Sequence, residues 1–181
     1  MARKTQRDWL DTAVQVLAEV GFNGLTIEAL TQRLGVTKGS FYHHFGSYQG
    51  FKTRFLQFYE EEGTLAVIEM AEDVETPQEK LCRLFEIIVS FSELSTRPEV
   101  ALRAWALQDD EVRRVQQRVD ERRTGYVQAL LNQILGNETQ ALTAARLLYA
   151  VLVGAEQMQP PITGTDLQKL FDEILHFYGI I

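Results

Sequence analysis

Apolar residues recur along this chain at the three- and four-residue spacing of amphipathic helices. Gly21 ends the first of these segments, and Gly35 separates two short ones. No segment of useful length alternates with the two-residue period of a half-buried strand. The pattern therefore predicts an all-α protein. The inward positions of its first four helices are Trp9, Ala13, Val16, Leu17 and Val20; Ile27, Leu30 and Leu34; Phe41 and Phe45; and Phe51, Phe55, Phe58 and Tyr59.

Helix-start signals divide the remainder into five further segments, which begin at Thr76, Pro98, Asp109, Glu138 and Thr165. The first has a capping box, Thr76-Pro-Gln-Glu79, with proline at the first helical position. Asp109 can cap the third, and two prolines after Met158 stop the fourth. About nine helices are therefore expected. The later inward positions are Leu81, Leu84, Phe85, Ile88 and Phe91; Leu102, Trp105 and Ala106; Val112, Val115, Val119, Tyr126, Leu130 and Ile134; and Leu167, Leu170, Phe171, Ile174, Leu175 and Tyr178.

Charge is distributed unevenly along the 181 residues, whose net charge is −7. Residues 1–54 carry seven Lys/Arg against four acids, or +3, which leaves −10 for the rest. A basic head on an acidic body lets the head approach phosphate while the body is repelled. This favours nucleic acid as a partner in spite of the negative total.

Composition also indicates the compartment. No stretch of eighteen apolar residues is present, and the polar start, Met-Ala-Arg-Lys-Thr-Gln-Arg, is unlike a signal peptide. We therefore expect a cytoplasmic protein. Cys82 has no second cysteine to pair with and lies on an apolar stripe, so we expect an inert buried thiol.

Residues 25–45 are predicted to form two short helices joined at Gly35, with Thr26 and Thr37 as N-caps. Phe41 and Phe45 turn the second helix inward, which leaves its opposite face for solvent. A Gly-hinged helix pair with polar and aromatic groups on its outer face is what a reader of the major groove needs.

Several residues of that outer face carry suitable chemistry. Lys38, in the first turn, can reach a guanine edge or a phosphate. Gly39 permits close approach of the backbone, whose free N–H groups can receive a phosphate. Ser40 and His43 are candidates for base contacts, and the Tyr42 hydroxyl suits a phosphate oxygen. The alternative for Tyr42 is that it covers the helix edge.

Residues 5–56 resemble the N-terminal DNA-binding domain of the TetR family of bacterial transcriptional repressors. The matching segments are Ala18–Phe22, Leu25–Leu30, Leu34–Phe45 and Gly46-Ser47. The resemblance implies a helix-turn-helix DNA-binding domain at residues 1–50, in which the second and third helices form the motif and the third enters the major groove. It also implies that residues 51–181 form an all-helical body that binds a small-molecule inducer. Thr26 and Thr37 join the DNA-binding candidates.

Two positions near this motif leave alternatives open. The family often has a phosphate-binding lysine where this chain has Tyr48, so the departure implies one fewer ionic contact and a gentler salt dependence, or compensation by Lys52. Glu28 could accept from a cytosine amine or complement the helix dipole, and the second is favoured.

For the body, the resemblance places an apolar inducer cavity among aromatic residues that would otherwise be ordinary core: Phe55, Phe58, Tyr59, Phe85, Phe91, Trp105 and Tyr126. It further implies a homodimer built on the last two long helices. The first of them, residues 138–157, is about 30 Å long. Its small side chains allow close approach of another helix, although an intramolecular core is the alternative: Ala141, Ala144, Ala145, Leu148, Val151, Leu152 and Ala155. Leu170, Ile174 and Tyr178 of the last helix would join them.

Two other classes of function compete with a DNA-binding regulator. Glu173 and His176 have the Glu-x-x-His spacing of di-iron bundles, but that site needs a second such motif. No nucleophile–base pair or zinc set stands out, so we expect no enzyme, metal or cofactor. An interaction module that lost DNA binding is disfavoured because Lys38, Ser40, Tyr42 and His43 occur together. The expected function is a homodimeric repressor that binds a palindromic operator and is released by a small-molecule inducer; activation stays open.

Overall fold

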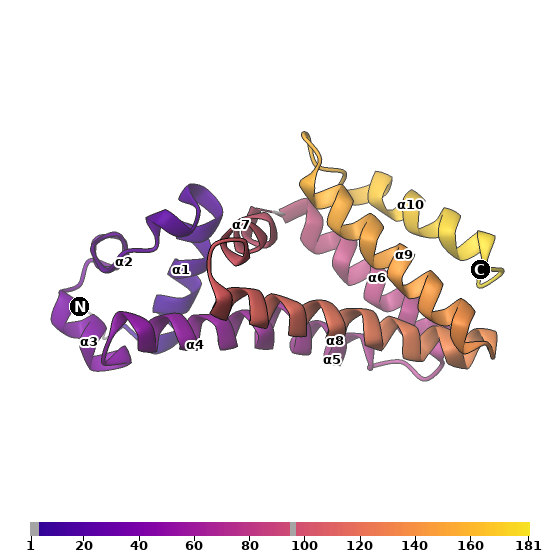
Figure 1. The fold of residues 1–181 in the computed structure, drawn as a ribbon, viewed down its shortest axis with the longest axis horizontal. Coiled ribbons are helices and arrows are strands. Elements are labelled where there is room, and N and C mark those ends of the chain that lie inside the picture. Colours follow the sequence, from indigo (N-terminus) through magenta and orange to yellow (C-terminus); the bar gives the residue numbers. More distant parts are fainter. Residues whose placement is uncertain (1–3, 95–96) are drawn as a thin grey trace. The chain divides into compact units, whose positions relative to one another are not determined.

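The computed structural model describes residues 4–94 and 97–181, which divide into two compact units. The first unit contains residues up to 61 together with 97–116, and the second contains 62–96 and 117–181, apart from the undescribed residues. Arg3, one of the cations counted in the basic head, lies outside the described residues. Within them the chain is all-helical, and Figure 1 labels its helices along the chain.

The first unit contains α1 (Gln6–Val20), a 3₁₀ turn (Phe22–Gly24), α2 (Ile27–Leu34), α3 (Lys38–Phe45), α4 (Tyr48–Glu60), α7 (Arg97–Ala106) and the first turns of α8 (Asp110–Leu135). Local caps begin several of these helices. Thr5 and Asp8 form a capping box on α1, and the Ser47 side chain accepts from the Gly50 backbone N–H at the start of α4.

Aromatic side chains fill the core of the first unit. Trp9 of α1 is fully buried, and its ring meets Phe41 of α3 edge-on, with 5.5 Å between ring centroids. Phe51 and Phe55 of α4 are also fully buried, and α7 packs along α1. Burying a large aromatic side chain is worth roughly 2–3 kcal/mol. These contacts therefore hold α3 and α4 firmly against α1.

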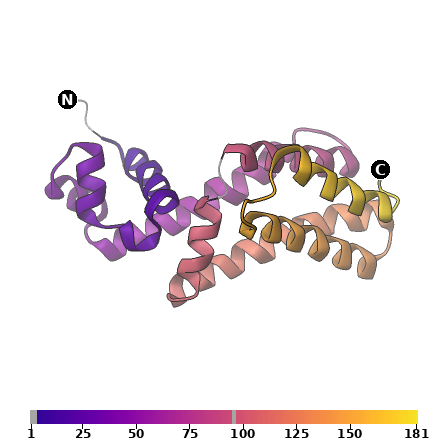
Figure 2. The ribbon, with the colours of Figure 1, turned by 90° about the horizontal axis from the view of Figure 1, so that it is seen from above.

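The second unit contains α5 (Ala66–Ala71), α6 (Pro77–Leu94), the remainder of α8, α9 (Glu138–Gln157) and α10 (Gly164–Phe177). The views in Figures 1 and 2 agree that α10 lies beside α6 and α9, and these helices are in contact. Phe85 of α6 stacks on Phe171 of α10, with 4.5 Å between ring centroids. The capping box predicted at the start of α6 is present, since Thr76 and Glu79 exchange hydrogen bonds of 2.9 and 3.2 Å.

A π-helical turn (Glu61–Leu65) connects α4 and α5, so that residues 48–71 are helical throughout. With that run counted as one, the described helices number nine, as predicted. None of the helices within the described ranges is long and apolar enough to cross a membrane.

Several expectations drawn from apolar spacing are wrong. Val20 is exposed, because Gly21 ends α1 before another helix covers its last turn. Cys82 is exposed on α6 rather than buried, since its neighbours Leu81, Leu84 and Phe85 define the inward face. Phe91 is 46% exposed near the end of the same helix.

Candidate nucleic-acid interface

The α2–α3 segment is a helix-turn-helix in the part of the chain described. The Thr26 side chain caps α2 by accepting from the Ala29 N–H at 3.1 Å, as predicted. Gly35 ends α2 with a φ of +65°, a left-handed conformation that glycine adopts without strain. Thr37 occupies the N-cap position of α3, but its side chain makes no capping hydrogen bond, so that prediction was only half right.

The inner face of α3 is fixed by packing. Phe41 is fully buried, and the ring of half-buried Phe45 lies 6.1 Å from that of Trp9 and 5.2 Å from that of Phe51. Gly50 of α4 comes so close to the Phe45 carbonyl oxygen that an added Cβ would lie 2.3 Å from it. Only glycine therefore fits where α4 passes the end of α3, and the outer face of α3 is held in one orientation.

That outer face has the exposure predicted for it. Lys38, Gly39, Tyr42 and His43 are exposed, and Ser40 is half-buried. Tyr42 packs one edge against Phe41 and leaves half of its surface in solvent. The chain thus presents an ammonium, a phenol and an imidazole within six residues of one short helix.

Lys38 has a partner that the sequence pattern did not predict. Its ammonium forms an ion pair with the Glu28 carboxylate at the start of α2, and both side chains remain exposed to water. The hydrogen bond from Lys38 lowers the pKa of Glu28, and the same bond raises the pKa of Lys38. Both groups therefore stay charged throughout the neutral range.

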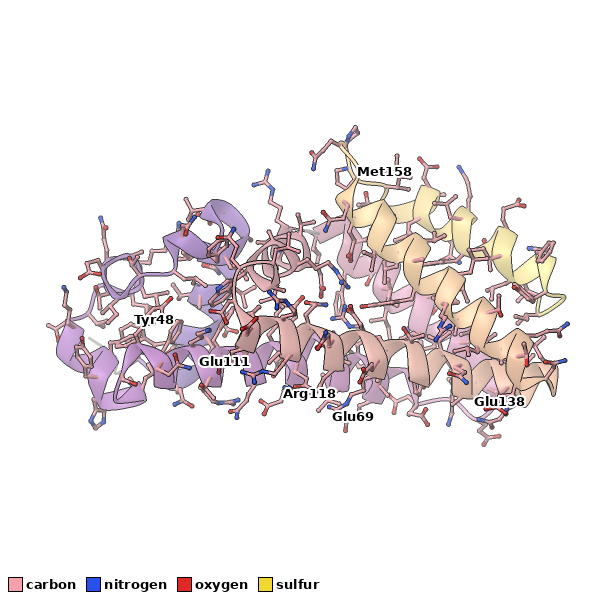
Figure 3. The ribbon with its side chains drawn as sticks, in the orientation of Figure 1. Tyr48, Glu69, Glu111, Arg118, Glu138 and Met158 are labelled. Carbon is pink, nitrogen blue, oxygen red and sulfur yellow. The ribbon has the colours of Figure 1, made fainter. Side chains whose placement is uncertain are left out.

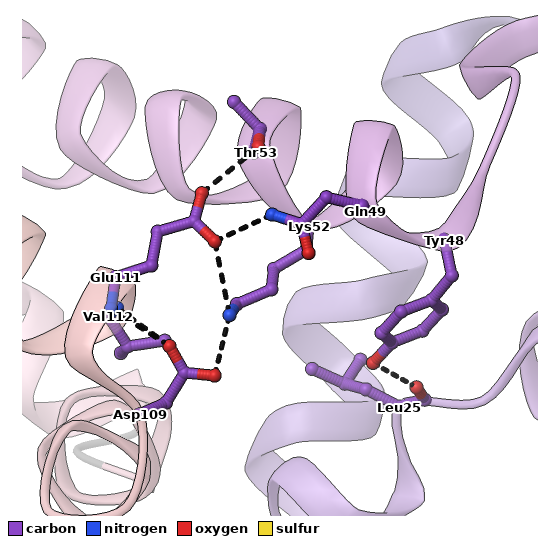
Figure 4. A network of polar contacts seen from close by, with 8 residues as sticks. All are labelled: Leu25, Tyr48, Gln49, Lys52, Thr53, Asp109, Glu111 and Val112. Atoms are coloured by element: carbon purple, nitrogen blue, oxygen red, sulfur yellow. Dashed lines mark hydrogen bonds and ion pairs between the residues drawn. The ribbon is translucent and has the colours of Figure 1, made fainter.

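Tyr48 uses its hydroxyl within the protein. The hydroxyl donates to the backbone carbonyl oxygen of Leu25 at 2.8 Å, which joins the start of α4 to the segment before α2 (Figure 4). A phosphate oxygen accepts hydrogen bonds and therefore needs a donor, but the Tyr48 proton is already engaged. Figure 3 shows this side chain at the start of α4. A phosphate contact at Tyr48 stays a prediction and would require this bond to break.

Lys52 is the centre of the polar network in Figure 4. Only 8% of its surface is exposed, and its ammonium lies 2.5 Å from Asp109 and 3.1 Å from Glu111. Gln49, three residues before Lys52 on α4, and Thr53, the residue directly after it, also donate to Glu111. In the free chain this ammonium is thus turned away from solvent and bound to two carboxylates. A phosphate contact by Lys52 stays a prediction that this geometry disfavours.

The charges of this network stabilise one another. Burial alone would raise the pKa of Asp109, but the hydrogen bonds from Lys52 and from the Val112 N–H outweigh it, and the pKa is lowered. Glu111 behaves in the same way. Burial would lower the pKa of Lys52, whereas the two carboxylates raise it overall. Asp109 also caps α8, as predicted, by accepting from Glu111 and Val112 N–H.

The aromatic residues predicted to line an inducer cavity occur in both units. In the first unit, Phe55, Phe58, Tyr59 and Trp105 are all buried. The Trp105 ring lies 6.5 Å from that of Phe55 and stacks on Phe22 at 6.0 Å. The rings of Phe22, Phe55 and Trp105 are thus brought together.

The other three predicted pocket residues lie in the second unit and differ from one another. Phe85 is part of the core through its stack on Phe171, whereas Phe91 is largely exposed. Tyr126 donates a 2.6 Å hydrogen bond to Glu72, and burial together with that carboxylate raises the pKa of Tyr126 well above its ordinary value. An inducer site at these residues stays a prediction.

The two long C-terminal helices bury one face and expose another. Most of the small residues proposed for the dimer contact face the core of their own unit instead: Ala141, Ala144, Ala145, Leu148, Leu152 and Ala155. The large apolar side chains left exposed on α9 and α10 are Leu147, Leu170 and Phe177, and Phe177 is 80% exposed. The α9 residues proposed for the dimer contact must therefore be revised. The two helices proposed for it, α9 and α10, stay the same.

The Glu-x-x-His pair lies on α10, where the His176 ring has a contact within its own helix. Nδ1 of His176 lies 2.8 Å from the carbonyl oxygen of Asp172, one turn earlier on α10. Among the described residues no group of three or more His, Cys, Asp or Glu side chains is arranged to hold a metal ion.

Comparison with known proteins gives a consistent picture. Residues 10–50 match the family described as bacterial regulatory proteins, tetR family. No curated protein sequence matches the chain. Among solved structures, a TetR transcriptional regulator from Legionella pneumophila is 13% identical, with a TM-score of 0.78 over 98% of this chain and 96% of that one.

Two further structures extend the comparison. A TetR-like transcriptional regulator from Rhodococcus sp. RHA1 is 20% identical, with a TM-score of 0.76 over 99% of each chain. The multidrug binding protein EbrR, complexed with malachite green, is also 20% identical, with a TM-score of 0.63 over 94% of this chain and 98% of that one. At these identities the likeness shows the fold. Together with the match of residues 10–50 to the tetR family, it shows that the chain has the fold of TetR-type transcriptional regulators.

Proposed function

We propose that this protein is a homodimeric transcriptional repressor that binds a palindromic DNA operator and leaves it when a small molecule binds to residues 51–181. The observation that carries the proposal is the outer face of α3, where Lys38, Tyr42 and His43 are exposed while Phe41 anchors the helix from behind. A recognition helix needs this combination of a rigid inner face and a polar outer one.

The DNA contacts are proposed for α3 and the cap of α2. Lys38 reaches a guanine edge, Ser40 and His43 contact bases, and Tyr42 donates to a phosphate. The backbone N–H of Gly39 and the hydroxyls of two caps add further phosphate contacts, those of Thr26 and Thr37. The internal bonds of Tyr48 and Lys52 favour structural roles for those two residues.

The dimer is proposed to form through the exposed apolar faces of α9 and α10, which include Leu147, Leu170 and Phe177. In an interface with two-fold symmetry, the same surface of both chains forms the contact. Two symmetric recognition helices then read half-sites about one helical turn, roughly 34–36 Å, or a longer multiple apart. A palindromic operator follows from that symmetry.

The releasing ligand is proposed to be a small, largely apolar molecule. The buried aromatic cluster of Phe55 and Trp105 in the first unit supports this chemistry, because apolar ligands favour aromatic walls. The multidrug binding protein EbrR, whose structure is similar to this one, was complexed with malachite green, an aromatic molecule, and this supports the proposal.

The test is direct. Fluorescence anisotropy with DNA from upstream of the protein's own gene should give a specific complex that competitor DNA does not abolish, and a panel of aromatic small molecules should include one that dissociates it. If that DNA does not bind, sequences selected from the whole genome take its place. The double substitution Lys38→Ala and Tyr42→Ala should then lower specific affinity by at least about a hundredfold. The guanine contact of Lys38, worth about 1–3 kcal/mol, is lost in each of the two half-sites, and the phosphate contact of Tyr42 is lost as well.

Arg83→Ala provides the control, because it removes a similarly exposed cation from α6, remote from α3 in the sequence. It should leave the affinity unchanged. Selected DNA bound equally well by the double variant and the unaltered chain would mean that α3 is not the recognition helix.

A further inference from the structure

Most of the cations in residues 4–54 form ion pairs. Of the six described Lys and Arg residues between positions 4 and 54, five contact a carboxylate, at Arg7, Arg33, Lys38, Lys52 and Arg54. Non-specific DNA binding depends on cations that neutralise phosphates and release counterions. A cation already paired with a carboxylate contributes less to that term. The free protein therefore offers DNA less positive charge than its sequence suggests.

The Lys38–Glu28 pair differs from the others because it joins the two helices of the helix-turn-helix. Lys38 is the first residue of α3, and Glu28 is the second residue of α2. Their side chains are 59% and 66% exposed, so water and DNA can reach both. By contrast, the pairs of Arg7 and Arg54 lie within α1 and between α4 and the π turn.

An ammonium has three N–H donors. With one donor directed at Glu28, two remain, which is the number that the O6 and N7 acceptors of guanine require. Contact with a phosphate requires the ammonium to turn toward the DNA backbone. The Glu28 carboxylate would then lose its partner and face the negative charge of the DNA. The pair is compatible with reading a base and opposed to neutralising a phosphate.

We infer that Glu28 is a specificity-determining residue, which positions the Lys38 ammonium for a guanine edge and withholds it from phosphates of non-operator DNA. This role rests on the DNA-binding function proposed above. Glu28 is thus a positioning residue that acts through Lys38. It favours the operator by weakening the competing sequence-independent complex.

The experiment compares Glu28→Gln with the unaltered chain on operator and on non-operator duplex, over a series of salt concentrations. Glu28→Gln should bind non-operator DNA about two- to fivefold more tightly, the range for an exposed ion pair. Its plot of log affinity against log salt on that DNA should be steeper by about 0.9, one added phosphate contact. The ratio of operator to non-operator affinity should fall.

Two matched variants separate this effect from general charge. Glu61→Gln makes the same change of charge and breaks the Arg54 pair at the end of α4, and it should leave the salt slope unaltered. In a Lys38→Gln background, Glu28→Gln should have no effect on the salt slope, because the ammonium that Glu28 restrains is gone. Urea unfolding confirms that each variant is folded.

Equal slopes for Glu28→Gln and the unaltered chain would overturn the inference, as would an effect that survives in Lys38→Gln. A fall in operator affinity with an unchanged non-operator slope would also overturn it, because the carboxylate would then read a base directly. If the unaltered chain bound no DNA, the proposed function itself would fail. That result is distinct from all the others.

Discussion

Lys52 is an ammonium that the fold takes out of solvent and surrounds with two carboxylates. Its position three residues before Phe55 and four before Leu56 places it on the buried face of α4. Such a side chain is tolerated because Asp109 and Glu111 supply the charge that water no longer supplies. Removing the ammonium leaves two partly buried carboxylates close together, which is costlier than losing the attraction alone.

Lys52→Met should therefore lower the free energy of unfolding by about 1–3 kcal/mol, less than a fully buried pair would lose because both acids keep some exposure. The measurement is urea unfolding. Arg54→Met, two residues along α4, breaks a more exposed pair and should cost less than about 1 kcal/mol.

The same variant tests the role of Lys52 on DNA. If Lys52 only holds α4 to the start of α8, the salt dependence of DNA binding by Lys52→Met should equal that of the unaltered chain. A slope shallower by about 0.9 would instead reveal a phosphate contact.

Most elements of the fold follow from local signals. Thr26, Thr76 and Asp109 begin their helices where predicted, because a cap and its N–H donor are two or three residues apart. The contacts that were not predicted join residues of different elements. Lys52 and Asp109 are 57 positions apart, and no spacing rule relates them.

The same distinction explains the errors within single helices. An apolar stripe predicts which face of a helix turns inward. It does not predict where along the helix the neighbouring helices stop covering that face. Val20 and Phe91 continue their stripes past that point and are exposed. For α9, spacing identified an alanine-rich face, but it could not say whether that face packs in its own chain or against a second copy. The outer face of α3 was predictable because Phe41 and Phe45 define its opposite.

The start of α8 should make stability depend on pH. The folded chain lowers the pKa of Asp109 and Glu111 below their ordinary values of about 4, so the unfolded chain binds protons first as pH falls. The stability that these carboxylates contribute is present above about pH 5 and is lost as pH drops through their folded pKa values.

Asp109→Asn isolates this effect, because asparagine still caps a helix but carries no charge for Lys52. Urea unfolding between pH 7 and pH 3 should show that the variant is the less stable at neutral pH and that the gap closes in acid. Parallel curves for the two proteins would contradict the assignment.

The exposed apolar residues of α9 and α10 determine how copies of the chain can associate. Leu147→Glu should weaken the proposed dimer by at least about a hundredfold. In a symmetric dimer the substitution removes Leu147 from both chains, and burying each leucine is worth about 1.5–3 kcal/mol. Analytical ultracentrifugation measures the change, and circular dichroism should be unaltered because Leu147 lies outside the core of the chain.

Leu107→Glu is the matched control, an exposed leucine just after α7 in the first unit. It should sediment like the unaltered chain. A dimer that withstands Leu147→Glu, or a chain that is already monomeric at micromolar concentration, would contradict the proposed interface.

Cys82 is the sole cysteine of the sequence and is exposed on α6. A maleimide dye therefore attaches at one defined position on each chain, with no residue to be replaced. Burial of part of the thiol, together with Glu86 and Asp172, raises the pKa of Cys82, so labelling is faster in mildly alkaline buffer. In a symmetric pair the two dyes are equivalent, and energy transfer between them reports association while both α3 and the exposed faces of α9 and α10 stay native.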